Sequence, residues 1–147
     1  PLEGLMMGTR CGDIDPASVI FLAEKEKISL LEIDRVLNYK SGLKGVSGIS
    51  NDIREVKKAA QQGNKRAQLA LDMFVYRIKK YIGSYVGALE GVDGIVFTVR
   101  IGENEKDIRK KILKGLFNFL NPRKVKVLVI PTNEELMIAR QTFHLAK

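Results

Sequence analysis

A chain of 147 residues, 45% of them hydrophobic, is long enough to bury one sizeable core, and it predicts a single domain over residues 1–147. No apolar run approaches the roughly 20 residues that a membrane helix needs, so we expect no membrane partner. The formal net charge of +8 raises the question of a nucleic-acid surface, or of attraction for anionic nucleotides. Because acidic residues are interleaved with the basic ones and no aromatic residues stand among them for base stacking, we expect no nucleic-acid partner.

Cys11 is the only cysteine, which excludes an internal disulfide, and no paired Cys or His motif has the spacing of a zinc site. Both features are typical of a reducing compartment, so we expect a cytoplasmic protein. Cys11 itself is open to two interpretations, a reactive thiol or a small buried side chain that fills space. Since the first residue is Pro1 and not Met, we expect these residues to have been cut from a longer chain.

Capping patterns mark the first two predicted helices. Asp15 can cap a helix that begins at Pro16, whose missing N–H costs nothing in a first turn, and that runs to about Lys25. Ser29 and Glu32 have the spacing of a capping box, in which the hydroxyl and the carboxylate satisfy each other's backbone N–H groups. The box predicts a second, short helix.

A glycine recurs at every third position between Ser41 and Ser50, at Gly42, Gly45 and Gly48. This pattern predicts a tightly turned loop in place of a stable helix. The composition leaves open whether a ligand approaches the loop or whether the loop is only structural.

Two helices are predicted next. Ser50 or Asn51 caps the first, which ends near Gln62. In the second, between residues 64 and 91, apolar residues at spacings of three and four predict one long buried stripe. The stripe consists of Ala67, Leu71, Phe74, Ile78, Ile82, Tyr85 and Leu89.

The last third of the chain alternates strands and helices. Buried strands are predicted for residues 94–99 and 125–130, and each is followed by a polar turn and a helix. Asn104 is the predicted cap of the first helix, whose apolar face is Ile108, Ile112, Leu116 and Leu120; a capping box of Thr132 and Glu135 opens the second. This order is typical of a largely parallel sheet, whose ligands gather at the carboxyl ends of the strands.

The turn over residues 101–104 joins a strand end to a helix start, where free N–H groups and the helix dipole favour an anion such as phosphate. It is neither a Walker A loop nor a Rossmann fingerprint, so the spacing alone is a weak signal. At the second turn, capping by Glu135 leaves Glu134 as the better candidate ligand for Mg²⁺. The alternative is that both acids only complement a helix N-terminus.

Arg10 lies between glycines, where a guanidinium could clamp phosphoryl oxygens; the alternative is an ion pair with Asp13 or Asp15. Asp52 and Arg54 lie two residues apart in the first turn of their helix. Either both contact a ligand, or they serve as a cap and a surface charge.

Taken together, these segments resemble the acetate kinases of the sugar-kinase, Hsp70 and actin superfamily. The resemblance implies an α/β protein: the C-terminal domain portion of an actin-like ATPase (ribonuclease H-like) fold, helix-rich with a small, incomplete, mainly parallel sheet. It covers nearly the whole chain. The matching segments, in the family's order, are residues 1–10, 12–16, 41–43, 47–50, 52–54, 97–98, 101–104 and 131–136.

The resemblance implies a reversible transfer of the γ-phosphoryl group of ATP to acetate, which gives acetyl phosphate and ADP and depends on Mg²⁺ or Mn²⁺. In similar enzymes the residue matching Arg10 stabilises the transferring group. It further implies a homodimer and a metal site at Glu134. The residues it assigns to nucleotide contact are Asp52, Ile53, Arg54, Arg100, Ile101, Gly102, Glu103 and Asn104. A propionate or butyrate kinase, and a non-catalytic nucleotide-binding fragment, are the alternatives.

The sequence departs from the family pattern in two places. Arg100, preceded by Val99, stands where the family loop has a glycine, which costs roughly 1 kcal/mol or more if that position needs a positive φ. The link from Phe119 to Lys124 is shorter than in the family. The family's N-terminal domain also has no counterpart, so we expect these 147 residues alone to bind nucleotide weakly and to turn over little or not at all.

Overall fold

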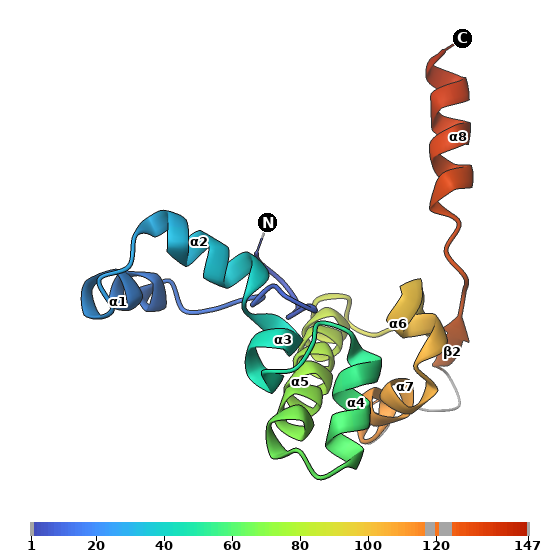
Figure 1. The fold of residues 1–147 in the computed structure, drawn as a ribbon. Coiled ribbons are helices and arrows are strands. Elements are labelled where there is room, and N and C mark those ends of the chain that lie inside the picture. The colour runs from blue at the N-terminus through green and yellow to red at the C-terminus, as the bar shows by residue number, and fades with distance from the viewer. Residues whose placement is uncertain (1, 117–119, 121–124, 147) are drawn as a thin grey trace. The chain divides into compact units, whose positions relative to one another are not determined.

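The computed structural model describes residues 2–116, 120 and 125–146 (Figure 1). Its contacts divide the chain into two compact units, Pro1–Ala88 and Leu89–Lys147, and each unit is described by itself. The single domain expected from chain length stays a prediction. So does the short link between Phe119 and Lys124, whose interpretation falls outside the described residues.

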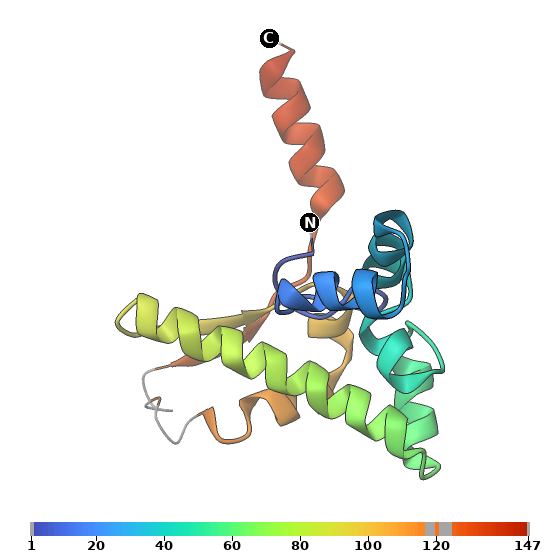
Figure 2. The same ribbon diagram turned by 90° about the vertical axis from the view of Figure 1, so that its left-hand side faces the viewer.

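The first unit is helical, and its longest helix runs without a break (Figure 2). Its elements are α1 (Ala17–Lys25), α2 (Leu30–Tyr39), α3 (Gly42–Ser47), α4 (Ile53–Gln61) and α5 (Lys65–Ala88). Helices α3 and α4 pack against α5. Leu43 and Val56 are completely buried there, each worth about 1.5–3 kcal/mol relative to exposure.

Both side chains predicted to cap the first two helices bind a nearby backbone N–H, although α1 begins at Ala17 with Pro16, and not Asp15, at the N-cap position. The Asp15 carboxylate accepts a hydrogen bond from the Ala17 N–H at 2.9 Å, and the Ser29 hydroxyl accepts one from the Glu32 N–H at 3.2 Å. The Glu32 carboxylate binds Lys40 at 2.6 Å and does not complete the box. Both helices are therefore confirmed, while only half of the capping box forms.

The glycine-rich segment is a short helix, α3, so the predicted loop is wrong. A Cβ at Gly42 would lie 2.2 Å from the Met7 carbonyl oxygen, and one at Gly45 would lie 2.5 Å from that of Lys40. The glycines therefore allow backbones to pack closely. Gly45 costs the helix about 1 kcal/mol relative to alanine in intrinsic propensity, and packing of α3 on its neighbours offsets that cost.

Helix α4 begins after Asp52, which replaces the predicted caps Ser50 and Asn51. The long helix α5 is confirmed, but its predicted stripe is buried only as far as Phe74. Tyr85 is 59% exposed and Leu89, just beyond the helix, is 67% exposed. The prediction of a stripe buried along its whole length is therefore wrong in this structure, because α3 and α4 cover only part of the long helix.

The second unit contains β1 (Gly94–Phe97), α6 (Val99–Asn104), α7 (Lys106–Leu113), β2 (Lys126–Val129) and α8 (Glu134–Leu145). The strands pair in parallel, with Gly94 opposite Lys126 and Phe97 opposite Val129, as the sequence predicts. Burial of the strands is overestimated, because only Phe97 within β1 and β2, and Val125 just before β2, are buried. The four residues predicted for the apolar face of the following helix, Ile108, Ile112, Leu116 and Leu120, are all buried, but α7 ends at Leu113 and the predicted helix through Leu120 is therefore too long.

Local capping differs from prediction at both polar turns. Residues 100–104 belong to the short helix α6, and Glu105, not Asn104, precedes α7. The Asn104 side chain instead donates to the Arg100 carbonyl at 2.9 Å. At α8 the cap is Asn133, whose side chain accepts from the Leu136 N–H at 3.1 Å, because Thr132 is bound elsewhere.

Among the described residues, none of the helices combines the length and the apolar character needed to cross a membrane.

Candidate functional site

Arg10 sits near the tip of a loop that closes on itself at its neck. The Asp13 N–H donates to the Gly4 carbonyl at 3.0 Å, and the Gly4 N–H donates to the Asp13 carboxylate at 2.5 Å. At the tip the Met7 N–H donates to the Arg10 carbonyl at 3.0 Å. Residues 4–13, called the Arg10 loop below, are thus closed by hydrogen bonds at both ends.

The start of α3 fastens the tip of the Arg10 loop. The N–H groups of Ser41, Leu43 and Lys44 donate to the carbonyls of Thr9, Met7 and Gly8 respectively, each at 2.9 Å. The first N–H groups of a helix have no partner within the helix, and the loop satisfies them here. The glycine-rich segment was correctly singled out, and its role in this structure is to hold the loop.

The Arg10 side chain is exposed, and among the described residues it makes no hydrogen bond or ion pair. The alternative of an ion pair with Asp13 or Asp15 is wrong, because Asp13 binds Arg77 and Asp15 accepts from the Ala17 N–H. Contact between Arg10 and a phosphoryl group stays a prediction. A guanidinium that extends from a fastened backbone is suited to that role.

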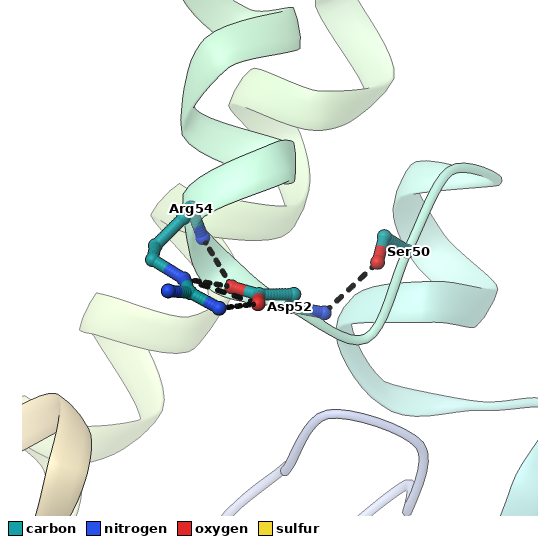
Figure 3. A network of polar contacts seen from close by, with 3 residues as sticks. All are labelled: Ser50, Asp52 and Arg54. Carbon is teal, nitrogen blue, oxygen red and sulfur yellow. Dashed lines mark hydrogen bonds and ion pairs between the residues drawn. The ribbon is translucent and has the colours of Figure 1, made fainter.

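The Asp52 carboxylate caps α4 by accepting from the Arg54 N–H at 2.9 Å, and it also pairs with the Arg54 guanidinium (Figure 3). The Ser50 hydroxyl accepts from the Asp52 N–H at 3.0 Å. The cap interpretation is therefore confirmed, while contact of these residues with a nucleotide stays a prediction. Ile53 between them is only 5% exposed, so its side chain belongs to the core.

The Arg10 loop and the cap of α4 are neighbours. A Cβ at Gly8 would lie 2.9 Å from the carbonyl oxygen of Asn51, so the two backbones are in contact there. The structure thus brings two of the predicted site segments, far apart in the sequence, into one region of the first unit.

A polar cluster that sequence reasoning missed joins the Arg10 loop to α5. The Asp13 carboxylate accepts from the Tyr81 hydroxyl at 2.5 Å and pairs with Arg77 at 3.1 Å. The Tyr81 hydrogen bond, followed by that from Gly4, lowers the pKa of Asp13, and the same bond to Asp13 raises the pKa of Tyr81. The only local signal is the spacing of Arg77 and Tyr81, one helical turn apart, which puts them on the same face.

In the second unit one carboxylate joins the two polar segments that follow β1 and β2. Glu103 Oε1 accepts from both the backbone N–H and the hydroxyl of Thr132, each at 2.9 Å. These bonds, with a smaller contribution from the Val99 N–H, lower the pKa of Glu103. Carboxyl ends of neighbouring parallel strands lie at the same edge of a sheet, and here Glu103 ties them together.

The end of α6 is also held from α7. Arg109 Nη1 donates to the carbonyls of Gly102 and Glu103, each at 2.8 Å. The predicted nucleotide segment, Arg100 to Asn104, is therefore a short helix whose final carbonyls are satisfied. Nucleotide contact by Arg100, Ile101, Gly102, Glu103 and Asn104 stays a prediction.

Backbone strain in this segment falls on Val99 and not on Arg100. Val99 has a φ of 63°, while Arg100 is not among the described residues with positive φ. A β-branched residue in the left-handed region is an outlier that costs roughly 1–2 kcal/mol. The sequence predicted a free-energy cost at Arg100 if that position has a positive φ. In the structure the positive φ, and with it the cost, is at Val99.

Glu134 is the first residue of α8 and is exposed. The capping-box reasoning that separated it from Glu135 is wrong, because Asn133 makes the cap. Among the described residues no three His, Cys, Asp or Glu side chains gather as a metal-binding group. A magnesium site at Glu134 stays a prediction, and so does convergence with Arg10, which lies in the other unit.

The sequence profile described as the Acetokinase family matches residues 1–121. The chain belongs to the acetokinase family. The acetate kinase of Treponema denticola is 52% identical, over 100% of this chain and 42% of its own. The acetate kinase of Methanosarcina thermophila is also 52% identical, and the alignment covers 97% of this chain and 40% of that protein. The chain thus spans about two fifths of the length of these relatives.

Solved structures agree with the family assignment. The structure of Porphyromonas gingivalis acetate kinase matches with a TM-score of 0.93 and 43% identity, over 100% of this chain and 42% of that one. A propionate kinase from Francisella tularensis matches with a TM-score of 0.86 and 41% identity, over 95% and 40%. The predicted fold class, a portion of an actin-like ATPase fold with a small parallel sheet, is confirmed.

Proposed function

We propose that the protein containing this chain transfers the γ-phosphoryl group of ATP to acetate, giving acetyl phosphate and ADP, and that the reaction is reversible. The observation that carries the proposal is the 52% identity, over the whole chain, to a protein named acetate kinase. Because the chain spans 42% of that relative, the activity is proposed for the complete protein. It is an in-line displacement: an acetate oxygen bonds to the γ-phosphorus as the bond to the β,γ-bridging oxygen breaks.

Arg10 is the catalytic residue we assign within this chain. Negative charge spreads over the three equatorial oxygens of the phosphoryl group in the transition state. A guanidinium offers fixed N–H donors to such oxygens, and Arg10 extends from a loop closed at both ends. Its exposure and its lack of a partner among the described residues leave these donors available.

We assign nucleotide contacts to two segments. One is the start of α4 with Asp52, Ile53 and Arg54, next to the Arg10 loop. The other is α6, at the carboxyl end of β1, where ligands of parallel sheets gather. Its residues are Arg100, Ile101, Gly102, Glu103 and Asn104. Because the Ile53 side chain is buried, we assign any nucleotide contact of Ile53 to its backbone atoms.

Glu134 is the residue of this chain that fits a Mg²⁺ or Mn²⁺ ion bound with the nucleotide. Mg²⁺ typically takes one or two carboxylates and completes its shell with water and substrate phosphates, so an exposed single carboxylate is compatible with it. The ion would neutralise charge on the phosphate oxygens. Glu103, already bound to Thr132, is suited to hold the loop next to Glu134.

Propionate is the second candidate substrate, because a propionate kinase is among the similar structures. Butyrate follows on chemical similarity alone. We also propose that the complete protein is cytoplasmic and homodimeric, as its resemblance to the acetate kinases and its cysteine usage suggest. A non-catalytic nucleotide-binding role is the competing proposal, motivated by the share of its relatives that this chain spans.

The test uses the full-length gene product with ATP, Mg²⁺, hydroxylamine and a series of acetate, propionate and butyrate. We expect acetyl hydroxamate above the enzyme-free control, and a fall in kcat of about 10²–10³-fold for Arg10→Ala, the size expected for one transition-state donor. Nucleotide binding without any acyl hydroxamate would support the non-catalytic role instead. A larger kcat/KM for propionate than for acetate would reassign the substrate.

A further inference from the structure

The Asp13 carboxylate connects the Arg10 loop to α5. It accepts from Gly4 at one end of the Arg10 loop and from Tyr81 on α5, and it pairs with Arg77, which also donates to the Asp13 carbonyl at 3.1 Å. The side chains of Asp13 and Arg77 are 37% and 23% exposed, so the cluster is half-buried. Arg77 and Tyr81 lie 64 and 68 positions from Asp13 in the sequence.

We propose that Asp13 is a positioning residue: with Arg77 and Tyr81 it fixes the neck of the Arg10 loop to α5 and thereby sets where the Arg10 guanidinium lies. The inference rests on the proposed function of Arg10. It adds a role for three residues that do not themselves touch the reacting atoms.

The other described backbone bonds of the loop run to elements other than α5. Near the tip, the bonds from Ser41, Leu43 and Lys44 hold the loop against the start of α3, and nearer the neck the Cys11 N–H donates to the Leu37 carbonyl of α2 at 3.0 Å. The neck bond from Asp13 to the Gly4 carbonyl closes the loop on itself. Asp13 connects that closed neck to α5, through its carboxylate and through the carbonyl that accepts from Arg77.

The geometry also explains why a carboxylate is needed. One oxygen, Oδ1, accepts from Gly4, while Oδ2 accepts from Tyr81 and faces Arg77. An asparagine has one accepting oxygen and an NH₂ group that only donates. Asp13→Asn therefore loses the ion pair with Arg77 and can meet Tyr81 only by donating to its hydroxyl, while the Arg77 bond to the Asp13 carbonyl remains.

Displacement of a catalytic group by about 1 Å can lower a rate on the order of 10²-fold. We expect a smaller loss here, since the backbone bonds at the tip remain. The prediction for Asp13→Asn is a fall in kcat of roughly tenfold, with KM for ATP changed by less than about twofold. Tyr81→Phe, which removes one hydrogen bond, is expected to lower kcat by roughly threefold.

The deciding experiment is a double-mutant cycle in the full-length gene product. If Asp13 acts through Arg10, Asp13→Asn lowers kcat in the wild-type background and has almost no further effect in Arg10→Ala. Asp72→Asn is the matched control, since it makes the same change on the exposed side of α5 and is expected to leave kcat unaltered. Circular dichroism and Tm confirm that each variant folds.

An equal loss of kcat in both backgrounds would overturn the inference, because the cluster would then act on overall structure and not through Arg10. An unchanged kcat for a folded Asp13→Asn would overturn it as well. If that variant does not fold, the Tyr81→Phe cycle with Arg10→Ala decides the matter by the same criterion. An Arg10→Ala variant with wild-type kcat would instead contradict the proposed function of Arg10, so the two failures are distinguishable.

Discussion

The Arg10 loop of the first unit and the pair of segments that follow β1 and β2 in the second unit each carry proposed site residues, yet they are held in different ways. The Arg10 loop is fastened by backbone bonds at its tip and neck and lies against a closely packed glycine. The segments after the strands are joined by the half-buried carboxylate of Glu103, and they include a strained Val99. The comparison indicates that the backbone that carries Arg10 is held by several backbone hydrogen bonds, while the segments that follow the strands are joined to each other through one side chain.

The largest expected effect is at Gly42, where the first region is most tightly packed. Its φ of 63° disfavours any side chain, and an added Cβ would meet the Met7 carbonyl at 2.2 Å. We expect Gly42→Ala to lower the free energy of unfolding by about 3 kcal/mol or more. Urea denaturation measures this change.

Gly63→Ala is the matched control, because Gly63 also has positive φ but has open space around the position of a Cβ. We expect it to cost only about 1 kcal/mol. Equal losses for the two variants would show that close packing of the Arg10 loop contributes little.

In the second region, glycine substitutions at Val99 and Arg100 are expected to have opposite signs. Val99→Gly relieves a left-handed β-branched residue and should stabilise the unit by about 0.5–1 kcal/mol after the entropic cost of glycine. Arg100→Gly weakens the short helix α6 and should destabilise by about 1 kcal/mol. Thermal unfolding of both variants tests the placement of strain, and stabilisation by Arg100→Gly would contradict it.

The Glu103 connection can be broken in two steps. Thr132→Val removes the hydroxyl but keeps the backbone N–H bond, whereas Glu103→Ala removes both bonds. We expect amide hydrogen exchange at residues 131–136 to become several-fold faster in Glu103→Ala and to change less in Thr132→Val. Exchange that is unaltered in Glu103→Ala would show that the two segments are held by other contacts.

The smallest effect is expected from pH. The pKa values of Asp13 and Glu103 are lowered in the folded state, mainly by hydrogen bonds from Tyr81 and from Thr132. Their stabilisation is therefore complete above an unfolded-state pKa of about 4 and is lost as the pH falls through the lower folded-state values. The difference in Tm between the wild type and Asp13→Asn should shrink over that acidic range, and a constant difference would contradict the assignment.

Some elements were predictable because their causes are local. The hydrogen bonds of Asp15 and Ser29 act within three residues of themselves, and the helical spacing of Ile108 and Ile112 places them on one buried face of α7. The parallel pairing of β1 and β2 follows from the order of strands and helices. The candidate residues Arg10, Asp52, Arg54 and Glu134 came from motifs of a few residues, and their proposed roles await the experiments above.

Other features depend on partners distant in the sequence. Gly42 and Gly45 predict a loop when only their own segment is considered. The backbone that packs against Gly42 comes from the Arg10 loop, which the local pattern does not indicate. Thr132 was predicted to cap α8, but Glu103, 29 positions away, binds it and leaves the cap to Asn133. Local sequence preference indicates neither the packing at Gly42 nor the distant partner of Thr132.

The sequence by itself determined the family, the helix-rich α/β class and most helix positions, because propensity, capping and apolar spacing act over a few residues. Only the tertiary structure decided which polar groups meet. Asp13 pairs with Arg77 and Tyr81, and Glu103 with Thr132, because folding brings distant segments within hydrogen-bond distance. A hydrogen bond requires a separation of about 3 Å, and no local pattern specifies which remote partner will reach it.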